Sequence, residues 1–283
     1  MLSVIQIFNL VIPYRNLHSS ISALRTTKEQ IKHFLEKTSL SPEGEQNRID
    51  FLDCLDRALK NSEFVHFCPT LHKFGSLSNG MGTYDSDIDI VIKFENLKID
   101  VLDYGTLMLA LEVIECILQE QLGIQSKDNI VPSKRCPIIK LNFSSCFPQI
   151  RKRPETDFNK CDISLISSYG VYNSKLLHFL TKYDYRFREL TLILKYWAKR
   201  NELIDTTTFS SYGFTMLIIF FLQNTNPPVL PTVSRLQDLA KQQKGNEALM
   251  VNKFNFQFCN DITIVGKSKN TQSVPELLLD FFR

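Results

Sequence analysis

Two aspartates, Asp87 and Asp89, alternate with Ile88 and Ile90 in a segment with strand-like sequence. Residues two apart on a β-strand point to the same face, so the two carboxylates share one face and the isoleucines share the other. Carboxylates placed this closely repel each other and are costly to desolvate unless a cation lies between them. Because Mg²⁺ prefers carboxylate and phosphate oxygens, the pair predicts a divalent-cation site acting on a phosphate substrate.

Three further residues extend this candidate site. Gly75 and Ser76 precede Asp87, with ten residues between Ser76 and Asp87. The glycine permits close backbone approach, and the serine hydroxyl can bind a phosphate. Asp162 opens the strand-like sequence CDISLI and is the candidate third carboxylate for a two-metal site. An isolated Asp-x-Asp is often surface charge on a strand edge, and it is the combination that favours function.

The elements that must position these side chains change in character along the chain. Apolar spacing predicts an α+β palm, built of helices and strands, followed by a helical domain. Helices are expected at 28–38, 45–62 and 104–121, with strands at 71–74, 88–94, 137–143 and 162–166. The later helices are expected at 174–182, 186–201, 210–224, 233–242 and 275–282.

We expect four segments along the chain. Residues 1–27 form a leader, 28–62 form helices that pack on the helical domain, 63–170 form the palm, and 171–283 form the helical domain. The leader has no acidic residue but is basic and contains serines, which is typical of a mitochondrial presequence. A proline within it would break a single amphipathic helix, so a disordered leader is the alternative.

Composition restricts the class of protein without identifying it. The hydrophobic fraction of 43% and the charged fraction of 22% are typical of a globular protein, and the net charge is +3. The basic residues gather in two zones, 134–160 and 181–201, as expected for binding a polyanion, although solvated surface charge is the alternative. The seven cysteines lack paired spacing, which indicates a reducing intracellular compartment, and no apolar run reaches the ~18 residues of a membrane span.

The segment FGSLSNGMGTYDSDIDIVI resembles the signature of the DNA polymerase β-like nucleotidyltransferases. Within that superfamily, the chain is similar to the noncanonical poly(A) polymerases and terminal uridylyltransferases. The later blocks YNSKLL, LILKYWAKR, FSSYGFTMLIIFFLQ and PPVLP follow in the family's order, and the match covers residues 60–283. The resemblance implies a polymerase β-like palm and an α-helical PAP-associated central domain, with the nucleotide bound in a cleft between them.

The resemblance also implies roles for the residues of the palm. Asp87, Asp89 and Asp162 match the catalytic carboxylates that hold two Mg²⁺ or Mn²⁺ ions. Ser76, which follows Gly75, matches the serine that contacts the phosphates of the nucleotide.

Further positions match residues that contact the rest of the nucleotide. The resemblance implies that Asn173 contacts the ribose and that Lys195 and Lys199 bind the triphosphate. The two lysines are four apart, so they share one face of a helix. Ser211 and Tyr212 match the pair that contacts and stacks on the base, although a core tyrosine is the alternative for Tyr212.

The sequence therefore predicts a template-independent nucleotidyltransferase that adds ribonucleotides from UTP or ATP to RNA 3′ ends. UMP is slightly favoured over AMP on the likeness of the SSYG and PPVLP blocks to cytoplasmic uridylyltransferases. A mitochondrial poly(A) polymerase becomes the better choice if residues 1–27 are a presequence, and a catalytically silent RNA-binding relative is the rival. Relatives continue beyond the position of Arg283 into a segment that closes over the base, so we expect weak discrimination between UTP and ATP.

Overall fold

The computed structural model describes residues 20–97, 99, 102–123, 129–134, 136–142, 160–166, 168–205, 208–243, 249–251 and 253–283. The chain divides into two compact units. Residues Ser39–Lys175 form one of them, here called the sheet unit. The part of the chain before Ser39 and residues Leu176–Arg283 form the other, here called the helical unit.

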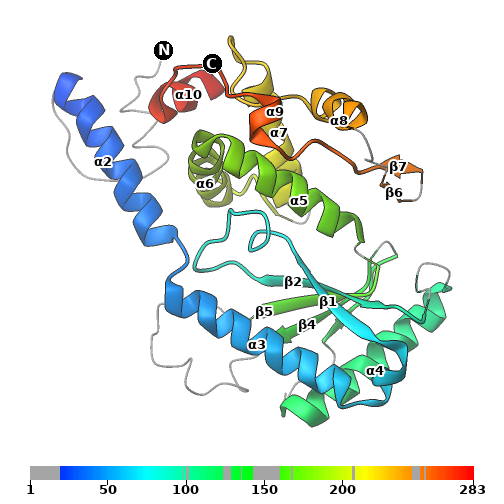
Figure 1. Ribbon diagram of the computed structural model, residues 1–283. Helices are drawn as coiled ribbons and strands as arrows, with labels where there is room; N and C mark the ends of the chain where they lie inside the picture. The colour runs from blue at the N-terminus through cyan, green and yellow to red at the C-terminus, as the bar shows by residue number, and fades with distance from the viewer. Residues whose placement is uncertain are drawn as a thin grey trace. The chain divides into compact units, whose positions relative to one another are not determined.

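A five-stranded sheet forms the centre of the sheet unit (Figure 1). Its strands are β1 (Pro69–Phe74), β2 (Ile88–Phe94), β3 (Ile130–Val131), β4 (Ile138–Asn142) and β5 (Lys160–Ser164), in the order β1-β2-β5-β4-β3. β2 pairs with β5 in parallel, and the other neighbouring strands pair antiparallel. β2 is thus an interior strand, paired with β1 on one edge and with β5 on the other.

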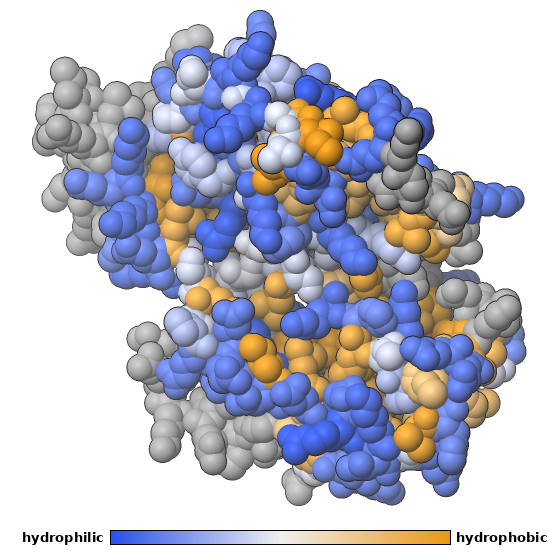
Figure 2. All heavy atoms as spheres, viewed as in Figure 1, coloured by the Kyte–Doolittle hydropathy of each residue, from blue (hydrophilic) through white to orange (hydrophobic). Residues whose placement is uncertain are grey.

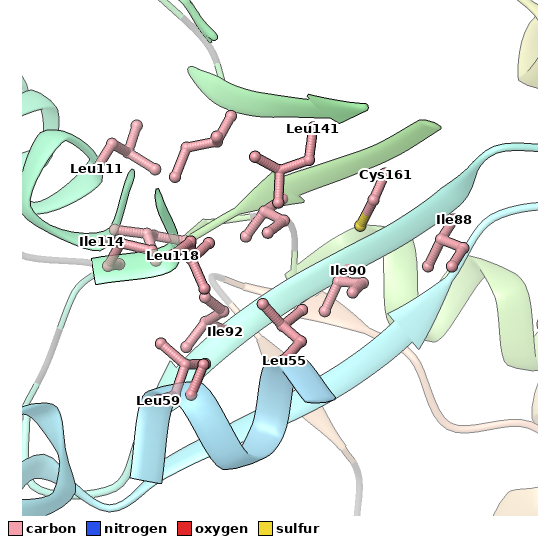
Figure 3. Packing of buried hydrophobic residues seen from close by; sticks show 14 of the residues in the cluster. Leu55, Leu59, Ile88, Ile90, Ile92, Leu111, Ile114, Leu118, Leu141 and Cys161 are labelled. Atoms are coloured by element: carbon pink, nitrogen blue, oxygen red, sulfur yellow. The ribbon is translucent and has the colours of Figure 1, made fainter. Parts of the chain in front are cut away.

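One face of this sheet packs against α3 (Pro42–Lys60) and α4 (Tyr104–Leu122), and Figure 3 shows the resulting core. The labelled side chains from these helices and strands interdigitate and are almost fully buried: Leu55, Leu59, Ile88, Ile90, Ile92, Leu111, Ile114, Leu118, Leu141 and Cys161. Each such aliphatic side chain contributes about 1.5–3 kcal/mol on burial. The short helix η1 (Glu63–Phe67) connects α3 to β1.

The position of α3 corrects one expectation. Residues 28–62 were expected to pack on the helical domain, but α3 buries Phe51, Leu55 and Leu59 in the core of the sheet unit. An apolar stripe requires a partner but does not specify which one, because the hydrophobic effect is non-directional. Ser41 caps the start of α3: its Oγ accepts a hydrogen bond from the Gly44 N–H at 3.0 Å.

The preceding helix, α2 (Ser20–Thr38), belongs to the helical unit and contacts α10 (Val274–Phe281). It begins inside the segment expected to be a leader, whose residues 1–19 lie outside the described part of the chain. Most of the basic zone expected at 134–160 also lies outside the described residues. The boundary between the units falls within α5 (Ser168–Tyr183), a few residues after the expected position at 170.

The rest of the helical unit follows the expected helical pattern. Its further elements are α6 (Tyr185–Arg200), α7 (Ser211–Gln223), α8 (Val233–Gln242), α9 (Ile262–Val265) and a small hairpin of β6 (Met250–Val251) and β7 (Phe254–Asn255). α6 buries Leu190, Ile193 and Leu194 completely. α10 packs against α6 and buries Leu277 and Leu278, so these apolar residues near the end of the chain are covered.

On the face drawn in Figure 2, hydrophilic residues predominate and hydrophobic residues reach the surface in separate patches. Large apolar side chains that are exposed include Leu109, Val113 and Phe220. Within the ranges that the structure describes, none of the helices has the length and apolar character needed to cross a membrane.

Candidate active site

The pairing of β2 with β5 places Asp89 beside Asp162. The two residues are register partners on parallel strands, as are their neighbours Ile88 and Cys161. Because Ile88 and Ile90 are buried in the core with α3 and α4, Asp89 points to the opposite face of the sheet. Asp162, in register on the next strand, shares that face, so the third candidate carboxylate is adjacent to the pair.

The charges of all three candidate carboxylates act on one neighbouring group, the buried thiol of Cys161. Burial raises the pKa of the Cys161 thiol well above its ordinary value, and the charges of Asp162, Asp89 and Asp87 raise it further. Burial also raises the pKa of Asp162, and the charge of Asp87 adds to this, whereas Lys140 lowers it. Desolvation and like charges both disfavour the ionised carboxylate, and a bound cation would remove this cost.

The donor set fits a hard divalent cation, because carboxylate oxygens are the ligands that Mg²⁺ and Mn²⁺ prefer. Even so, no three His, Cys, Asp or Glu side chains in the described part of the chain are gathered closely enough to form a ligand set. Asp162 Oδ2 lies 3.8 Å from Lys140 Nζ, and Asp89 Oδ2 lies against the backbone of Gly75. Convergence of the three carboxylates on bound ions therefore stays a prediction.

Gly75 brings the backbone of the turn after β1 against Asp89. Its φ is +71°, and a Cβ at this position would lie 1.9 Å from Asp89 Oδ2, so no larger residue fits without movement. The Gly75 N–H donates a hydrogen bond to Ser174 Oγ at 2.8 Å, and this hydroxyl donates to the Gly170 carbonyl at 2.8 Å. The turn that carries Ser76 is thereby fixed to the first part of α5.

The first part of α5 lies on the same face of the sheet as Asp89. A Cβ on Gly170 would lie 2.7 Å from the ring of Phe74, and Phe74 is the register partner of Asp89. Asn173 precedes Ser174 in this part of α5 and is half-buried. The structure thus brings Asn173 near the Gly75 turn, and it adds Ser174, which the sequence had not indicated.

A second residue that the sequence reasoning missed is Arg48 on α3, which is only 4% exposed. Its guanidinium donates hydrogen bonds to the carbonyls of Tyr84 and Ser86, both at 3.1 Å. These carbonyls belong to the turn that leads directly into Asp87. The detectable signal was an arginine on the apolar stripe of α3, three residues before buried Phe51.

The charge of Asp87, a residue of the candidate site, also acts on Arg48. Burial lowers the pKa of Arg48 to about 10, against the opposing effect of the carboxylates of Asp85, Asp87 and Glu45. The guanidinium therefore remains protonated at neutral pH. Asp85 lies in the turn before β2 and accepts a hydrogen bond from Thr83 Oγ1 at 2.6 Å.

The remaining candidate residues lie in the helical unit. On α6, Lys195 is half-buried and Lys199 is exposed. Ser211 is the first residue of α7, and Ser210 caps the helix by accepting a hydrogen bond from the Gly213 N–H at 3.0 Å. Tyr212 is 45% exposed, and partial burial raises the pKa of its hydroxyl.

The known proteins that this chain resembles include poly(A) polymerases and terminal uridylyltransferases. The sequence model of a family described as "Poly(A) RNA polymerase, mitochondrial-like, central palm domain" matches residues 27–182, more than half of the 283 residues. The speckle targeted PIP5K1A-regulated poly(A) polymerase of Danio rerio is 25% identical over 97% of this chain and 36% of its own length. Terminal uridylyltransferase cid1 of Schizosaccharomyces pombe is 29% identical over 81% of this chain and 50% of its own length.

A solved structure shows the same fold. The crystal structure of mtPAP in complex with ATPγS matches with a TM-score of 0.74 and 25% identity, covering 98% of this chain and 56% of that one. This chain spans about a third to a half of the two curated relatives just named. The family match over residues 27–182 and the shared fold place the chain among the poly(A) polymerases and terminal uridylyltransferases, in the mitochondrial-like poly(A) RNA polymerase central palm domain family.

Proposed function

We propose that this chain transfers ribonucleotides to the 3′ end of RNA without a template. The observation that carries the proposal is the in-register pair of Asp89 and Asp162, on the sheet face next to the Gly75 turn. Relatives named poly(A) polymerase or terminal uridylyltransferase support the same class of reaction.

In this reaction the 3′ oxygen of the RNA attacks the α-phosphorus of a ribonucleoside triphosphate. A phosphorus–oxygen bond forms to the RNA, the bond to the bridging oxygen of the β-phosphate breaks, and pyrophosphate leaves while the hydroxyl proton passes to solvent. Asp87, Asp89 and Asp162 are proposed to hold two Mg²⁺ or Mn²⁺ ions. When bound, such ions lower the pKa of the attacking hydroxyl and neutralise charge on the leaving group. The protein contributes positioning and charge.

Other residues are proposed to bind the nucleotide. In the sheet unit, Ser76 binds a phosphate and Asn173 contacts the ribose, which favours ribonucleotides. Support comes from the hydrogen bonds through Ser174 that fix the turn carrying Ser76 to α5.

For the helical unit, we propose that Lys195 and Lys199 bind the triphosphate and that Ser211 and Tyr212 contact the base. The two lysines share a face of α6 that is distinct from its buried apolar stripe. Tyr212 is exposed enough at the start of α7 for a base to stack on its ring.

We propose UMP as the preferred addition and AMP as the alternative. Relatives of both kinds are similar to this chain, so nucleotide choice must be measured directly. Incubating the protein with labelled RNA and each of the four ribonucleotides should give the highest kcat/KM with UTP. A preference for ATP, together with mitochondrial import of a reporter fused to residues 1–27, would instead identify a mitochondrial poly(A) polymerase.

The central test replaces Asp89 by Asn in the full chain. Incorporation should fall below detection, whereas the melting temperature should stay equal or rise because repulsion between neighbouring carboxylates is relieved. Asp53→Asn is the matched control, since Asp53 is an exposed carboxylate on α3, which packs on the other face of the sheet. Undiminished incorporation by the Asp89 variant would refute the proposed site. A wild-type chain that binds RNA but incorporates nothing would support the catalytically silent alternative.

A further inference from the structure

A group of basic side chains lies on the same sheet face as Asp89. In the antiparallel pairing of β1 with β2, Thr70 opposes Lys93 and Phe74 opposes Asp89. Side chains alternate along each strand, so Lys93 and His72 share the face of Asp89. His72 Nε2 lies 3.1 Å from Thr70 Oγ1 on this face.

The first part of α5 adds a tyrosine and a second lysine to this group. Lys93 Nζ lies 5.7 Å from the centroid of the Tyr172 ring, and Lys175 Nζ lies 5.5 Å from the same centroid. Both distances permit a cation–π interaction. Lys175 is exposed, and Lys93, Tyr172 and His72 are half-buried, so solvent reaches the group. We name these four residues the basic site.

The two lysines of the basic site carry positive charge close to His72. Neither lysine forms an ion pair with a carboxylate in the described ranges of the chain. The pKa of His72 is lowered, first by burial and then by the charges of Lys93 and Lys175. Two ammonium groups lie near one ring, and their charges add to the effect of burial in lowering the pKa of the neighbouring imidazole. A bound anion would relieve the repulsion between these positive groups.

We infer that the basic site binds a phosphate of the RNA strand whose 3′ end is extended at Asp87 and Asp89. This inference rests on the proposed function. Asp89 and Lys93 are four residues apart on β2, about 13 Å along the strand. A triphosphate placed with its α-phosphate at the carboxylates has only two further phosphates, whereas an RNA strand continues past the reacting end. Both ammonium groups lie within 6 Å of the centroid of the Tyr172 ring, so one phosphate near this ring could contact both of them.

The test is the salt dependence of RNA binding by the full chain, measured by fluorescence anisotropy with a labelled single-stranded RNA of mixed sequence. EDTA in the buffer prevents extension, so binding is measured independently of turnover. The slope of log affinity against log salt is about −0.7 per phosphate contact for single strands. Lys93→Ala/Lys175→Ala should therefore make the slope less steep by about 0.7, and Lys175→Ala alone should make it less steep by a smaller amount.

Two controls separate this effect from a loss of folding. Lys175 is exposed, so Lys175→Ala should leave the melting temperature unchanged. Lys73→Ala changes an exposed lysine on β1 that alternates to the other face from His72, and it should keep the wild-type slope. Lys93→Arg/Lys175→Arg keeps the charge and should also keep the slope. In extension assays, the double alanine variant should raise the KM for RNA and leave the KM for the nucleotide unchanged.

Unchanged salt slopes in both alanine variants would overturn the inference. A raised KM for the nucleotide with an unchanged RNA slope would also overturn it, because the basic site would then serve the triphosphate. Failure of the wild-type chain to incorporate nucleotides would reject the proposed function, but the binding slopes would still decide whether the basic site contacts RNA.

Discussion

Replacement of Arg48 should destabilise the sheet unit and disturb Asp87. The guanidinium makes two hydrogen bonds to the turn before Asp87, at the carbonyls of Tyr84 and Ser86, and one within its own helix. A hydrogen bond from a charged donor contributes about 1.5–3 kcal/mol, and the cost of burying the charge reduces the net value. The turn can rehydrate when the arginine is removed, so we expect Arg48→Ala to lower the free energy of unfolding by about 2–4 kcal/mol.

Arg48→Lys separates charge from geometry. A lysine keeps the positive charge but cannot donate in a fork to two carbonyls, so we expect a smaller loss of about 1–2 kcal/mol. Chemical denaturation at pH 7 measures the stability, and incorporation at increasing Mg²⁺ measures the site. Both variants should need more Mg²⁺ for half-maximal rate, because the backbone leading into Asp87 is no longer held.

The control for this prediction is Arg57→Ala. Arg57 lies on the same helix but is exposed, and its side chain bonds only within α3, to the Asp53 carbonyl and to Cys54 Sγ. Its replacement should change the free energy of unfolding by less than about 0.5 kcal/mol and leave the Mg²⁺ dependence unchanged. If Arg48→Lys matches the wild-type protein in both stability and Mg²⁺ dependence, the assigned role of Arg48 is wrong.

Two further predictions concern the same face of the sheet. Gly75→Ala should abolish incorporation, and it should lower the free energy of unfolding more than Gly123→Ala does. Both glycines have positive φ, but only at Gly75 would the new Cβ meet other atoms. Equal losses of stability in denaturant titrations would contradict this prediction. The lowered pKa of His72 means that the folded state binds fewer protons than the unfolded state, so this residue reduces stability as pH falls from 6.5 towards its folded pKa. Lys93→Ala/Lys175→Ala should raise the pKa of His72, which NMR titration can measure. Burial is the larger cause of the lowered pKa, so the pKa should still lie below 6.5 in this variant. An unchanged pKa would show that the two lysines do not act on His72.

Local patterns in the sequence predicted most of the elements. The alternation of aspartate and isoleucine gave the strand at 88–94, which is β2 with the same bounds, and apolar spacing gave the helix at 233–242, which is α8 with the same bounds. These patterns are reliable because side-chain periodicity follows directly from backbone geometry.

The partners of these elements depended on tertiary structure. Nothing local in the sequence shows that β2 pairs in parallel with β5, yet this pairing alone places Asp162 beside Asp89. The hydrogen bond between Gly75 and Ser174 likewise joins residues far apart in the chain.

The sequence by itself therefore indicated the candidate residues for chemistry and showed which faces of the elements are apolar. Only the tertiary structure decided that α3 packs in the sheet unit rather than with α2, and that Arg48 on it holds the turn before Asp87. The physical reason is that burying the apolar face of a helix or strand is favourable against any apolar surface of matching shape. The choice among such surfaces is made by strand register, packing and specific hydrogen bonds, which form only when distant segments meet.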